Sequence, residues 1–195
     1  MSRSAVFLDR DGTINVEKHF LHRIQDWEWT PSAIEAIRTF NRRGFQVIVV
    51  SNQAGIARGL FTTSAVHKLH YGINTLLAQQ GARIDDFYFC PHHPDFGSKR
   101  RCFCRKPSPG LIYKAQKEHG LDLSRSYLIG DKAIDVQMGQ TAGVQPILVL
   151  TGYGRKEKTK ISHCVPVVKN LYYAMKWVLM DFKRHPRLNP SRRKK

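Results

Sequence analysis

The chain has 195 residues, of which 42% are hydrophobic and 24% charged, and its formal net charge is +17. This composition is that of a globular protein with a sizeable core, and it excludes a disordered chain. Apolar runs such as residues 47–50 are far too short to span a bilayer, so we expect no membrane partner. So basic a chain favours an anionic ligand, either nucleic acid or a small molecule.

Strands and helices alternate along the chain. Hydrophobic periodicity predicts strands over residues 5–8, 45–50, 84–89, 126–129 and 146–150. The helices predicted between and after them are one opened by Thr30-Pro31 and ended by Gly44, one over residues 66–77, one opened by Ser108-Pro109, a short one after Asp131 and one over residues 171–182. This order predicts an α/β fold with a doubly wound, mostly parallel sheet.

The positive charge is concentrated at the C-terminus. Residues 183–195 contain seven lysines and arginines, two prolines and no acid, which is typical of a disordered tail. We therefore predict a single domain over residues 1–182 and a basic, disordered tail over residues 183–195. A second basic segment, residues 155–160, is expected to be a loop. No leader segment is evident at the N-terminus, so we expect a cytoplasmic protein, and we expect a monomer.

Polar side chains follow each of the first four strands. In such sheets ligands bind beyond the carboxyl ends of the strands, so we expect these residues to converge on one edge. They are Asp9 and Asp11 after the first strand, Ser51 and Asn52 after the second, Cys90 and His92 after the third, and Asp131 after the fourth.

Two carboxylates lie two residues apart in the segment Asp9-Arg10-Asp11-Gly12-Thr13. One carboxylate can attack an electrophile while the other handles protons, and the glycine lets the backbone turn tightly. Further along the chain, Ser51 and the amides after it can hold phosphate oxygens, and Lys106 supplies a fixed cation. Asp131 and Asp135 supply carboxylates that can hold a hard metal ion.

In these four motifs the sequence resembles the phosphatases of the haloacid dehalogenase superfamily over roughly residues 4–150. The resemblance implies that Asp9 is the nucleophile, forming an aspartyl-phosphate, and that Asp11 protonates the leaving alcohol and later activates water. Ser51 and Lys106 would bind the transferring phosphoryl group. Mg²⁺ would be held by Asp9, the carbonyl of Asp11 and Asp131, with Asp135 in support.

Three of the four cysteines lie in one loop rich in basic residues and proline. A buried position does not suit cysteines in such surroundings, and a cytosolic protein seldom forms disulfides. Together with a histidine they suit a closed tetrahedral Zn²⁺ site, and metal ligation can stabilise a loop with few apolar residues. Cys164 stands apart and is predicted to be a core residue. The predicted zinc ligands are Cys90, His92, Cys102 and Cys104, with His93 as the alternative histidine.

Within the superfamily, the segments Ser51-Asn-Gln-Ala-Gly and Cys104-Arg-Lys-Pro resemble the D-glycero-D-manno-heptose-1,7-bisphosphate 7-phosphatases. The related histidinol-phosphate phosphatases share much of this pattern. The resemblance implies removal of the 7-phosphate of a heptose bisphosphate, in the route to activated heptose for lipopolysaccharide. Polynucleotide 3′-phosphatases of the same superfamily are an alternative that the positive charge favours, and an RNA-binding zinc knuckle is a non-enzymatic one.

The gaps between the motifs leave no room for a large cap domain. Short loops must then recognise the substrate. Arg58 and Arg105 are the predicted contacts of a second phosphate, since a guanidinium group can bind phosphate through two parallel hydrogen bonds. Asn52 is also predicted to contact the substrate.

Overall fold

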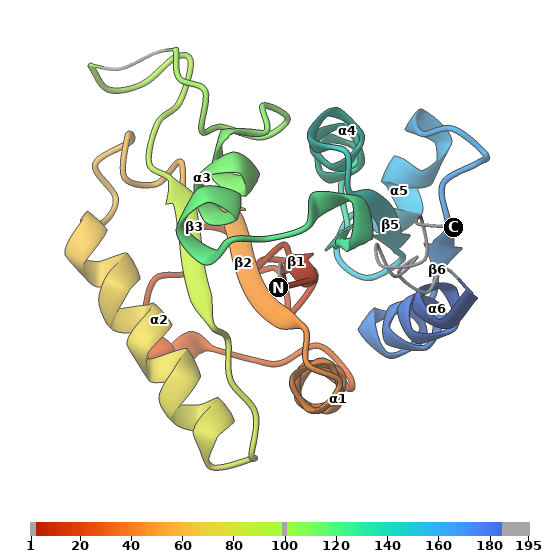
Figure 1. The fold of residues 1–195 in the computed structure, drawn as a ribbon. Coiled ribbons are helices and arrows are strands. Elements are labelled where there is room, and N and C mark those ends of the chain that lie inside the picture. Colours follow the sequence, from red (N-terminus) through yellow and green to blue (C-terminus); the bar gives the residue numbers. More distant parts are fainter. Residues whose placement is uncertain (1–2, 99–100, 185–195) are drawn as a thin grey trace.

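The computed structural model describes residues 3–98 and 101–184. At its centre is a six-stranded sheet in which every pair of neighbouring strands is parallel, in the order β3-β2-β1-β4-β5-β6 (Figure 1). The predicted doubly wound α/β fold is thereby confirmed. The strands are β1 (Ala5–Leu8), β2 (Gln46–Asn52), β3 (Asp86–Cys90), β4 (Tyr127–Gly130), β5 (Gln145–Val149) and β6 (Val167–Val168).

Helices cover both faces of the sheet (Figure 1). α1, α2 and α6 pack on one face, and α3 and α4 pack on the other. The α-helices are α1 (Ala33–Arg42), α2 (Thr63–Ala78), α3 (Gly110–His119), α4 (Ala133–Ala142), α5 (Gly154–Glu157) and α6 (Leu171–Arg184). Short 3-10 helices occupy Ile24–Asp26, Leu123–Arg125 and Lys158–Lys160.

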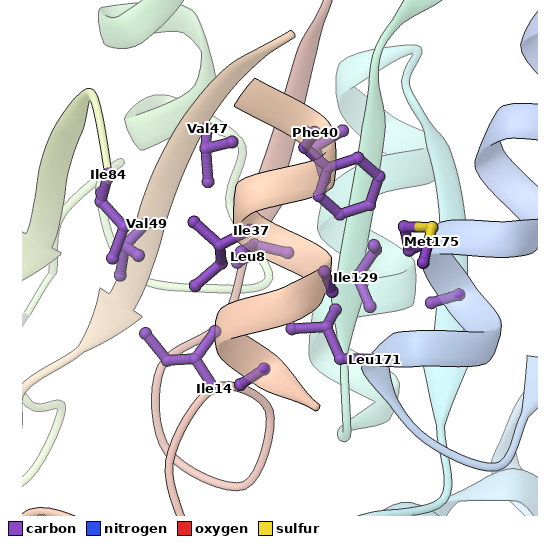
Figure 2. Close-up of a cluster of buried hydrophobic side chains, with 14 of the residues drawn as sticks. Leu8, Ile14, Ile37, Phe40, Val47, Val49, Ile84, Ile129, Leu171 and Met175 are labelled. Carbon is purple, nitrogen blue, oxygen red and sulfur yellow. The ribbon is translucent and has the colours of Figure 1, made fainter. Parts of the chain in front are cut away.

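Successive side chains of the central strands enter two different cores. Val6 and Leu8 of β1 belong to the core under α1, α2 and α6, whereas Phe7 belongs to the core under α3 and α4. A strand covered on both faces needs apolar side chains at every position, which is why the central strands contain continuous hydrophobic runs. Figure 2 shows part of the first core, to which Ile37 and Phe40 of α1 and Met175 of α6 contribute side chains.

The chain crosses from one half of the sheet to the other between β1 and β4. From β1 it continues to β2 and β3 on one side, and it then returns to β4 on the other side of β1. Loops that leave two neighbouring strands in opposite directions open a crevice at the carboxyl ends, where ligands bind in such sheets. The segments after β1 and β4, which carry Asp9 and Asp131, meet there.

No separate cap domain interrupts these connections among the described residues. Residues 9–32 contain one three-residue 3-10 helix, and residues 53–62 contain neither helix nor strand. Nor does any helix in the described parts of the chain have the length and apolar character needed to cross a bilayer. The absence of a large cap agrees with the prediction, and it leaves the crevice bordered by loops.

The first helix begins later than predicted. α1 starts at Ala33, and Ser32 precedes it in a left-handed conformation (φ 63°), so Thr30-Pro31 is not its cap. The Thr30 hydroxyl instead donates a hydrogen bond to the carbonyl of Thr13, at 2.6 Å. This bond ties the loop after β1 to the start of α1, and it therefore helps to fix the segment that carries Asp9 and Asp11.

The C-terminal third departs from the prediction in several places. The basic segment predicted as a loop forms α5 and a 3-10 helix, and the two-residue strand β6 follows it. Cys164 is exposed rather than in the core, because its neighbour Val165 takes the buried position. α6 extends to Arg184, so the first two residues of the predicted tail are helical. The prediction for residues 185–195 lies outside the described residues.

Candidate active site

A pocket of about 540 Å³ opens at the carboxyl edge of the sheet, where β1, β2 and β4 end. Its floor contains Asp9, Asp11 and Lys106. One wall is the loop after β1, and the opposite wall is built from α4, α5 and the 3-10 helix that follows α5. The other residues that line the pocket, including three at the end of β2 and just after it, are Glu17, His19, Phe20, Asn52, Gln53, Ala54, Lys132, Ile134, Tyr153, Glu157 and Lys160.

Asp9 follows the last residue of β1 and is buried. Its Oδ1 atom lies 2.7 Å from Nζ of Lys106 and accepts a hydrogen bond of 2.7 Å from the backbone N–H of Arg10. Among the described residues, none donates a hydrogen bond to Oδ2. The arrangement therefore orients the carboxylate through one oxygen and leaves the other for chemistry.

Asp11 is held away from Asp9 by a bidentate ion pair with the fully buried side chain of Arg10, at 2.8–3.2 Å. Asn15 and Gln53 donate further hydrogen bonds to it, at 3.0 and 3.3 Å. Burial favours the protonated form of Asp11, but Arg10 and the hydrogen bonds outweigh it and lower the pKa of the carboxyl group below its usual value. In this state of the site Asp11 is a carboxylate.

Gly12 allows the loop after β1 to pass directly over Asp131. Its φ of +85° is in the left-handed region, where side chains other than glycine are strained. A Cβ atom at this position would lie 2.3 Å from Oδ2 of Asp131. Both the backbone conformation and the close approach therefore require the glycine of the Asp9-Arg10-Asp11-Gly12 segment.

Lys106 is buried at the floor of the pocket, and both its ammonium group and its backbone are held by neighbouring residues. Its ammonium group lies 2.6 Å from Asp135 Oδ1 and donates to the carbonyl of Val50 at 3.1 Å. Its backbone N–H donates to the side chain of Asn52 at 3.0 Å, and its carbonyl accepts from the same side chain at 3.2 Å. Burial alone would lower the pKa of Lys106, but the carboxylates of Asp135 and Asp9 raise it, so the lysine is a permanent cation.

The two residues predicted after β2 have different surroundings. Both belong to the end of the strand, which reaches Asn52. Ser51 is buried, and its hydroxyl accepts a hydrogen bond of 3.2 Å from Gln53. Asn52 lines the pocket, but its amide is occupied by the backbone of Lys106. Asn52 thus positions the lysine, a role that residue spacing alone did not indicate.

Three buried carboxylates form one of the two groups in the described residues with the proximity to hold a metal ion. Oxygen atoms of Asp9, Asp131 and Asp135 lie within 4.8 Å of one another. Burial and repulsion by Asp9 raise the pKa of Asp131 to about 8, and burial also raises that of Asp135, to about 6. Oδ1 of Asp131 is buried without a hydrogen-bond partner. An oxygen-only set with an orphaned carboxylate oxygen fits a hard divalent cation such as Mg²⁺.

The second wall of the pocket contains functional residues that the sequence analysis missed. The backbone N–H of Tyr153 donates to Oδ2 of Asp131 at 2.7 Å, and its ring lies 4.7 Å from the ammonium group of Lys132. Glu157 accepts a hydrogen bond of 3.0 Å from the N–H of Ala133, at the start of α4. The predicted short helix after Asp131 pointed to this region, but only the folded path of α5 brings these side chains to the pocket.

The four predicted zinc ligands lie together, beyond the end of β3. Sγ of Cys90 lies 3.3 Å from Sγ of Cys104 and 3.5 Å from Sγ of Cys102, and Nδ1 of His92 lies 3.3 Å from Sγ of Cys104. Ligand atoms at the corners of a zinc tetrahedron are about 3.7 Å apart, so this cluster fits the ion closely. All three cysteines are free thiols. His93, the alternative histidine, is outside the cluster and accepts a hydrogen bond from the N–H of Asp95.

The two arginines predicted to grip a second phosphate are engaged elsewhere. The guanidinium group of Arg58 lies over the ring of Phe96, 3.9 Å from its centroid. Arg105 donates a hydrogen bond of 2.9 Å to the carbonyl of His92 and so braces the loop that carries the cysteines. Neither arginine lines the pocket.

Comparison with known proteins places this site in a family. Residues 103–174 match a family of HAD-hydrolase-like proteins. A D-glycero-beta-D-manno-heptose-1,7-bisphosphate 7-phosphatase of Yersinia pestis is 42% identical over 153 residues, which cover 76% of this chain and 81% of that protein. A D-glycero-alpha-D-manno-heptose-1,7-bisphosphate 7-phosphatase of Photorhabdus laumondii is 40% identical, covering 79% of this chain and 86% of that protein.

Solved structures agree with the sequence relatives. The D,D-heptose 1,7-bisphosphate phosphatase of B. bronchiseptica, solved with magnesium and phosphate, has a TM-score of 0.83 and 32% identity and covers 91% of this chain and 99% of its own. The resemblance found in the four motifs is thereby confirmed at the level of the whole domain. The chain belongs to the heptose-1,7-bisphosphate 7-phosphatase family of the HAD-like hydrolases, and it is a phosphatase.

Proposed function

We propose that this phosphatase removes the 7-phosphate of D-glycero-D-manno-heptose 1,7-bisphosphate through a phosphoaspartate on Asp9, with Mg²⁺ as cofactor. The observation that carries the proposal is the buried group of Asp9, Asp131 and Asp135 around Lys106, at the floor of an open pocket. Relatives named for this reaction, at about 42% identity, support the substrate.

The first half-reaction transfers the phosphoryl group to the protein. The Oδ2 atom of Asp9 attacks phosphorus, and the bond between phosphorus and the C7 oxygen of the sugar breaks. Asp11 gives a proton to that leaving oxygen. For this step its carboxyl group must leave the ion pair with Arg10, contact the substrate and carry a proton. Since Oδ1 of Asp9 is fixed by Lys106, attack by the other oxygen needs little reorganisation.

The second half-reaction releases inorganic phosphate. Asp11 now takes a proton from a water molecule, and the water oxygen attacks phosphorus while the bond to Asp9 breaks. Lys106 and the hydroxyl and backbone amides at Ser51 hold the phosphoryl oxygens in both steps. The buried ammonium group of Lys106 suits this role because its partners keep it charged and in place.

The magnesium ion would be held by Asp9, the carbonyl of Asp11 and Asp131, with Asp135 in support. When bound, the cation offsets the repulsion between the carboxylates and an anionic phosphate and stabilises charge on the phosphoryl oxygens. The raised pKa of Asp131 supports this assignment, because an ionised carboxylate there lacks any cation of its own besides Lys132.

Zinc would be held by Cys90, His92, Cys102 and Cys104. Because Arg105 and Lys106 follow Cys104 directly, the ion would also fix the backbone that leads to the phosphate-binding lysine. Its role is structural, with a consequence for catalysis.

The test is phosphate release by the magnesium-loaded protein from a panel of substrates. The panel contains both anomers of heptose 1,7-bisphosphate, histidinol phosphate and a DNA 3′-phosphate. We expect the heptose bisphosphates to have the highest kcat/KM, and the relatives include enzymes named for each anomer. A higher kcat/KM for histidinol phosphate or for the DNA end would overturn the proposed substrate. Zinc content, oligomeric state and cellular location, predicted as zinc-bound, monomeric and cytoplasmic, are measured on the same protein.

A further inference from the structure

His70 is a buried histidine of α2, on the face of the sheet that carries the first core. Its ring stacks on Phe87, with 4.2 Å between the ring centroids and an interplanar angle of 14°, and Phe89 lies edge-on to it at 5.7 Å. These two contacts fix the plane of the imidazole. Both ring nitrogens are buried, and neither has a hydrogen-bond partner among the described residues. The ring therefore holds an unused hydrogen-bond acceptor inside the protein.

The imidazole of His70 is uncharged. Burial, and after it the positive charges of Arg10 and His67, lower the pKa of His70 to about 3. The charge of Asp11 acts in the opposite direction but does not compensate for them. At neutral pH one ring nitrogen therefore carries a hydrogen and the other can accept one. Since the effect of a charge falls with distance, Arg10 and Asp11 both lie near this ring.

Arg10 has an unused donor in the same region. Its side chain is fully buried, its Nε and Nη2 atoms bind Asp11, and Nη2 also donates to the carbonyl of Leu21 at 2.8 Å. Nη1 is buried as well, and no group in residues 3–98 and 101–184 accepts a hydrogen bond from it. Leu21 belongs to the same core cluster as Leu69, the residue before His70. α2 thus packs on the segment that holds the arginine.

The proposed reaction places a demand on Arg10. Asp11 must leave the arginine to give its proton to the substrate, and the guanidinium group would then keep one acceptor, the carbonyl of Leu21. A buried cation that loses its partner is strongly unfavourable unless another group takes up its hydrogen bonds. A neutral imidazole can do so without adding charge to the interior.

We propose that His70 is a positioning residue, which accepts a hydrogen bond from Nη1 of Arg10 while Asp11 works at the substrate. Arg10 moves toward the ring when Asp11 leaves it and returns when Asp11 does. This assignment rests on the proposed function and deepens it. It explains how Asp11 can be tightly paired at rest and still become available for proton transfer.

The kinetic test separates a step that needs the proton of Asp11 from one that does not. Phosphoryl transfer to Asp9 is measured in single turnovers, from heptose 1,7-bisphosphate and from an aryl phosphate, whose leaving group needs no proton. We expect His70→Leu to slow transfer from the sugar about tenfold and from the aryl phosphate less than about twofold, with both dissociation constants unchanged. His70→Gln keeps a buried acceptor and should restore most of the rate. His67→Leu, at an exposed histidine one turn earlier, is the matched control.

Three kinetic results would overturn the inference. Equal slowing of both substrates in His70→Leu would mean that His70 only supports the fold. Wild-type transfer from the sugar in the same variant would mean that Arg10 needs no second acceptor. A defect in His70→Gln as large and as selective as that of His70→Leu would mean that the acceptor is not what the site requires.

A spectroscopic measurement needs no sugar substrate. The ring nitrogens of ¹⁵N-labelled histidines are observed by NMR in the magnesium-loaded protein, with and without beryllium fluoride, which binds to an aspartate as an analogue of a phosphoryl group. The signal that His70→Gln lacks is assigned to His70. We expect its acceptor nitrogen to shift upfield in the complex, because Asp11 turns toward the analogue and Arg10 then donates to the ring. An identical signal in both states would overturn the inference. Failure of the wild-type protein to release phosphate from heptose bisphosphate would refute the proposed substrate alone.

Discussion

The two clusters that fit metal ions are built in opposite ways. Asp9, Asp131 and Asp135 are buried oxygen ligands: Asp9 and Asp131 directly follow β1 and β4, and Asp135 lies in the first turn of α4. The Cys90 cluster is a set of sulfur and nitrogen ligands that are mostly half-buried, and three of them belong to one loop beyond β3. Packing of the core holds the carboxylates of the first site in place. At the second site, the metal ligands themselves must hold the loop in place.

This difference indicates what a metal ion at each site would do for the fold. The carboxylates repel one another, so their proximity lowers the stability of the folded state, and a bound cation would reduce this repulsion. The described residues of the loop from residue 91 to residue 105 contribute few side chains to the two main cores, so zinc ligation would supply the stability that burial does not. We therefore expect the carboxylate site to fold without its ion and the cysteine loop to depend on zinc.

The largest expected effect follows from Asp9→Asn. Removal of the nucleophile should lower kcat by about 10⁴-fold or more, because no neighbouring group can form the covalent intermediate in its place. The melting temperature should not fall, since the substitution removes one charge from three crowded carboxylates. Steady-state phosphate release and thermal unfolding measure the two effects. Turnover close to that of the wild type would show that Asp9 is not the nucleophile.

Cys104→Ser tests the cluster of Cys90, His92, Cys102 and Cys104. Loss of one ligand should release zinc and lower the melting temperature by about 5–10 °C, with kcat reduced at least tenfold because Lys106 follows two residues later. Metal analysis, thermal unfolding and turnover are measured together. Cys164→Ser, at an exposed cysteine outside the cluster, is the control and should change none of them. A zinc-free Cys104→Ser protein with full stability would show that the loop does not need zinc to stay folded.

Asn52 joins the two regions, because its side chain binds both backbone groups of Lys106. Asn52→Ala should lower kcat about tenfold while zinc content and KM change little, since the lysine loses its alignment but not its charge. Asn41→Ala, which removes a side-chain bond to Arg83 on the surface, is the matched control. A large rise in KM with unchanged kcat would mean that Asn52 contacts the substrate, as the sequence analysis predicted.

The smallest effect is a pH dependence of magnesium stabilisation. Asp131 has a pKa raised from 3.8 to about 8, so the metal-free fold binds a proton that the unfolded chain has lost. Its contribution to stability is present below pH 3.8 and is lost as the pH rises toward 8. Magnesium should therefore raise the melting temperature more at pH 8 than at pH 6, by about 3 °C.

Asp131→Asn tests the cause of this pH dependence. The variant should be more stable than the wild type without metal at pH 8, because it keeps the shape of the carboxyl group without its charge. It should also lose most of the magnesium shift. A wild-type magnesium shift that is equal at both pH values, or larger at pH 6, would contradict the repulsion among the carboxylates.

Much of the site was predictable from the sequence because local patterns determine it. The run of residues 45–50 could be buried only in a covered strand, and the residues after each strand therefore had to meet at one edge. Asp9, Lys106 and Asp131 converge there, and Cys90, His92, Cys102 and Cys104 form their cluster as the spacing indicated. These predictions succeed because strand ends and short loops place side chains with little help from distant contacts.

The rest depended on tertiary packing that no local pattern shows. The basic residues 155–160 suggested a loop, yet they form a helical wall in which Glu157 contacts α4 and Lys160 lines the pocket. The substrate contact of Arg58 stays a prediction; its guanidinium group lies over the ring of Phe96, a contact that the sequence pattern did not indicate. Thr30 was predicted as a cap because Pro31 follows it, whereas its hydrogen-bond partner, the carbonyl of Thr13, lies in another segment.

Asp9 is the residue proposed to carry the phosphoryl group during hydrolysis of heptose 1,7-bisphosphate. The most direct measurement is mass spectrometry of the Asp11→Asn protein, quenched during turnover and digested. The substrate is an aryl phosphate, whose leaving group needs no proton from residue 11. Without its second carboxylate the protein cannot activate water, so the peptide that contains Asp9 should gain the mass of one phosphoryl group. The same peptide from Asp9→Asn should gain nothing. An unmodified Asp9 peptide while the Asp11→Asn protein still releases phosphate would contradict the account.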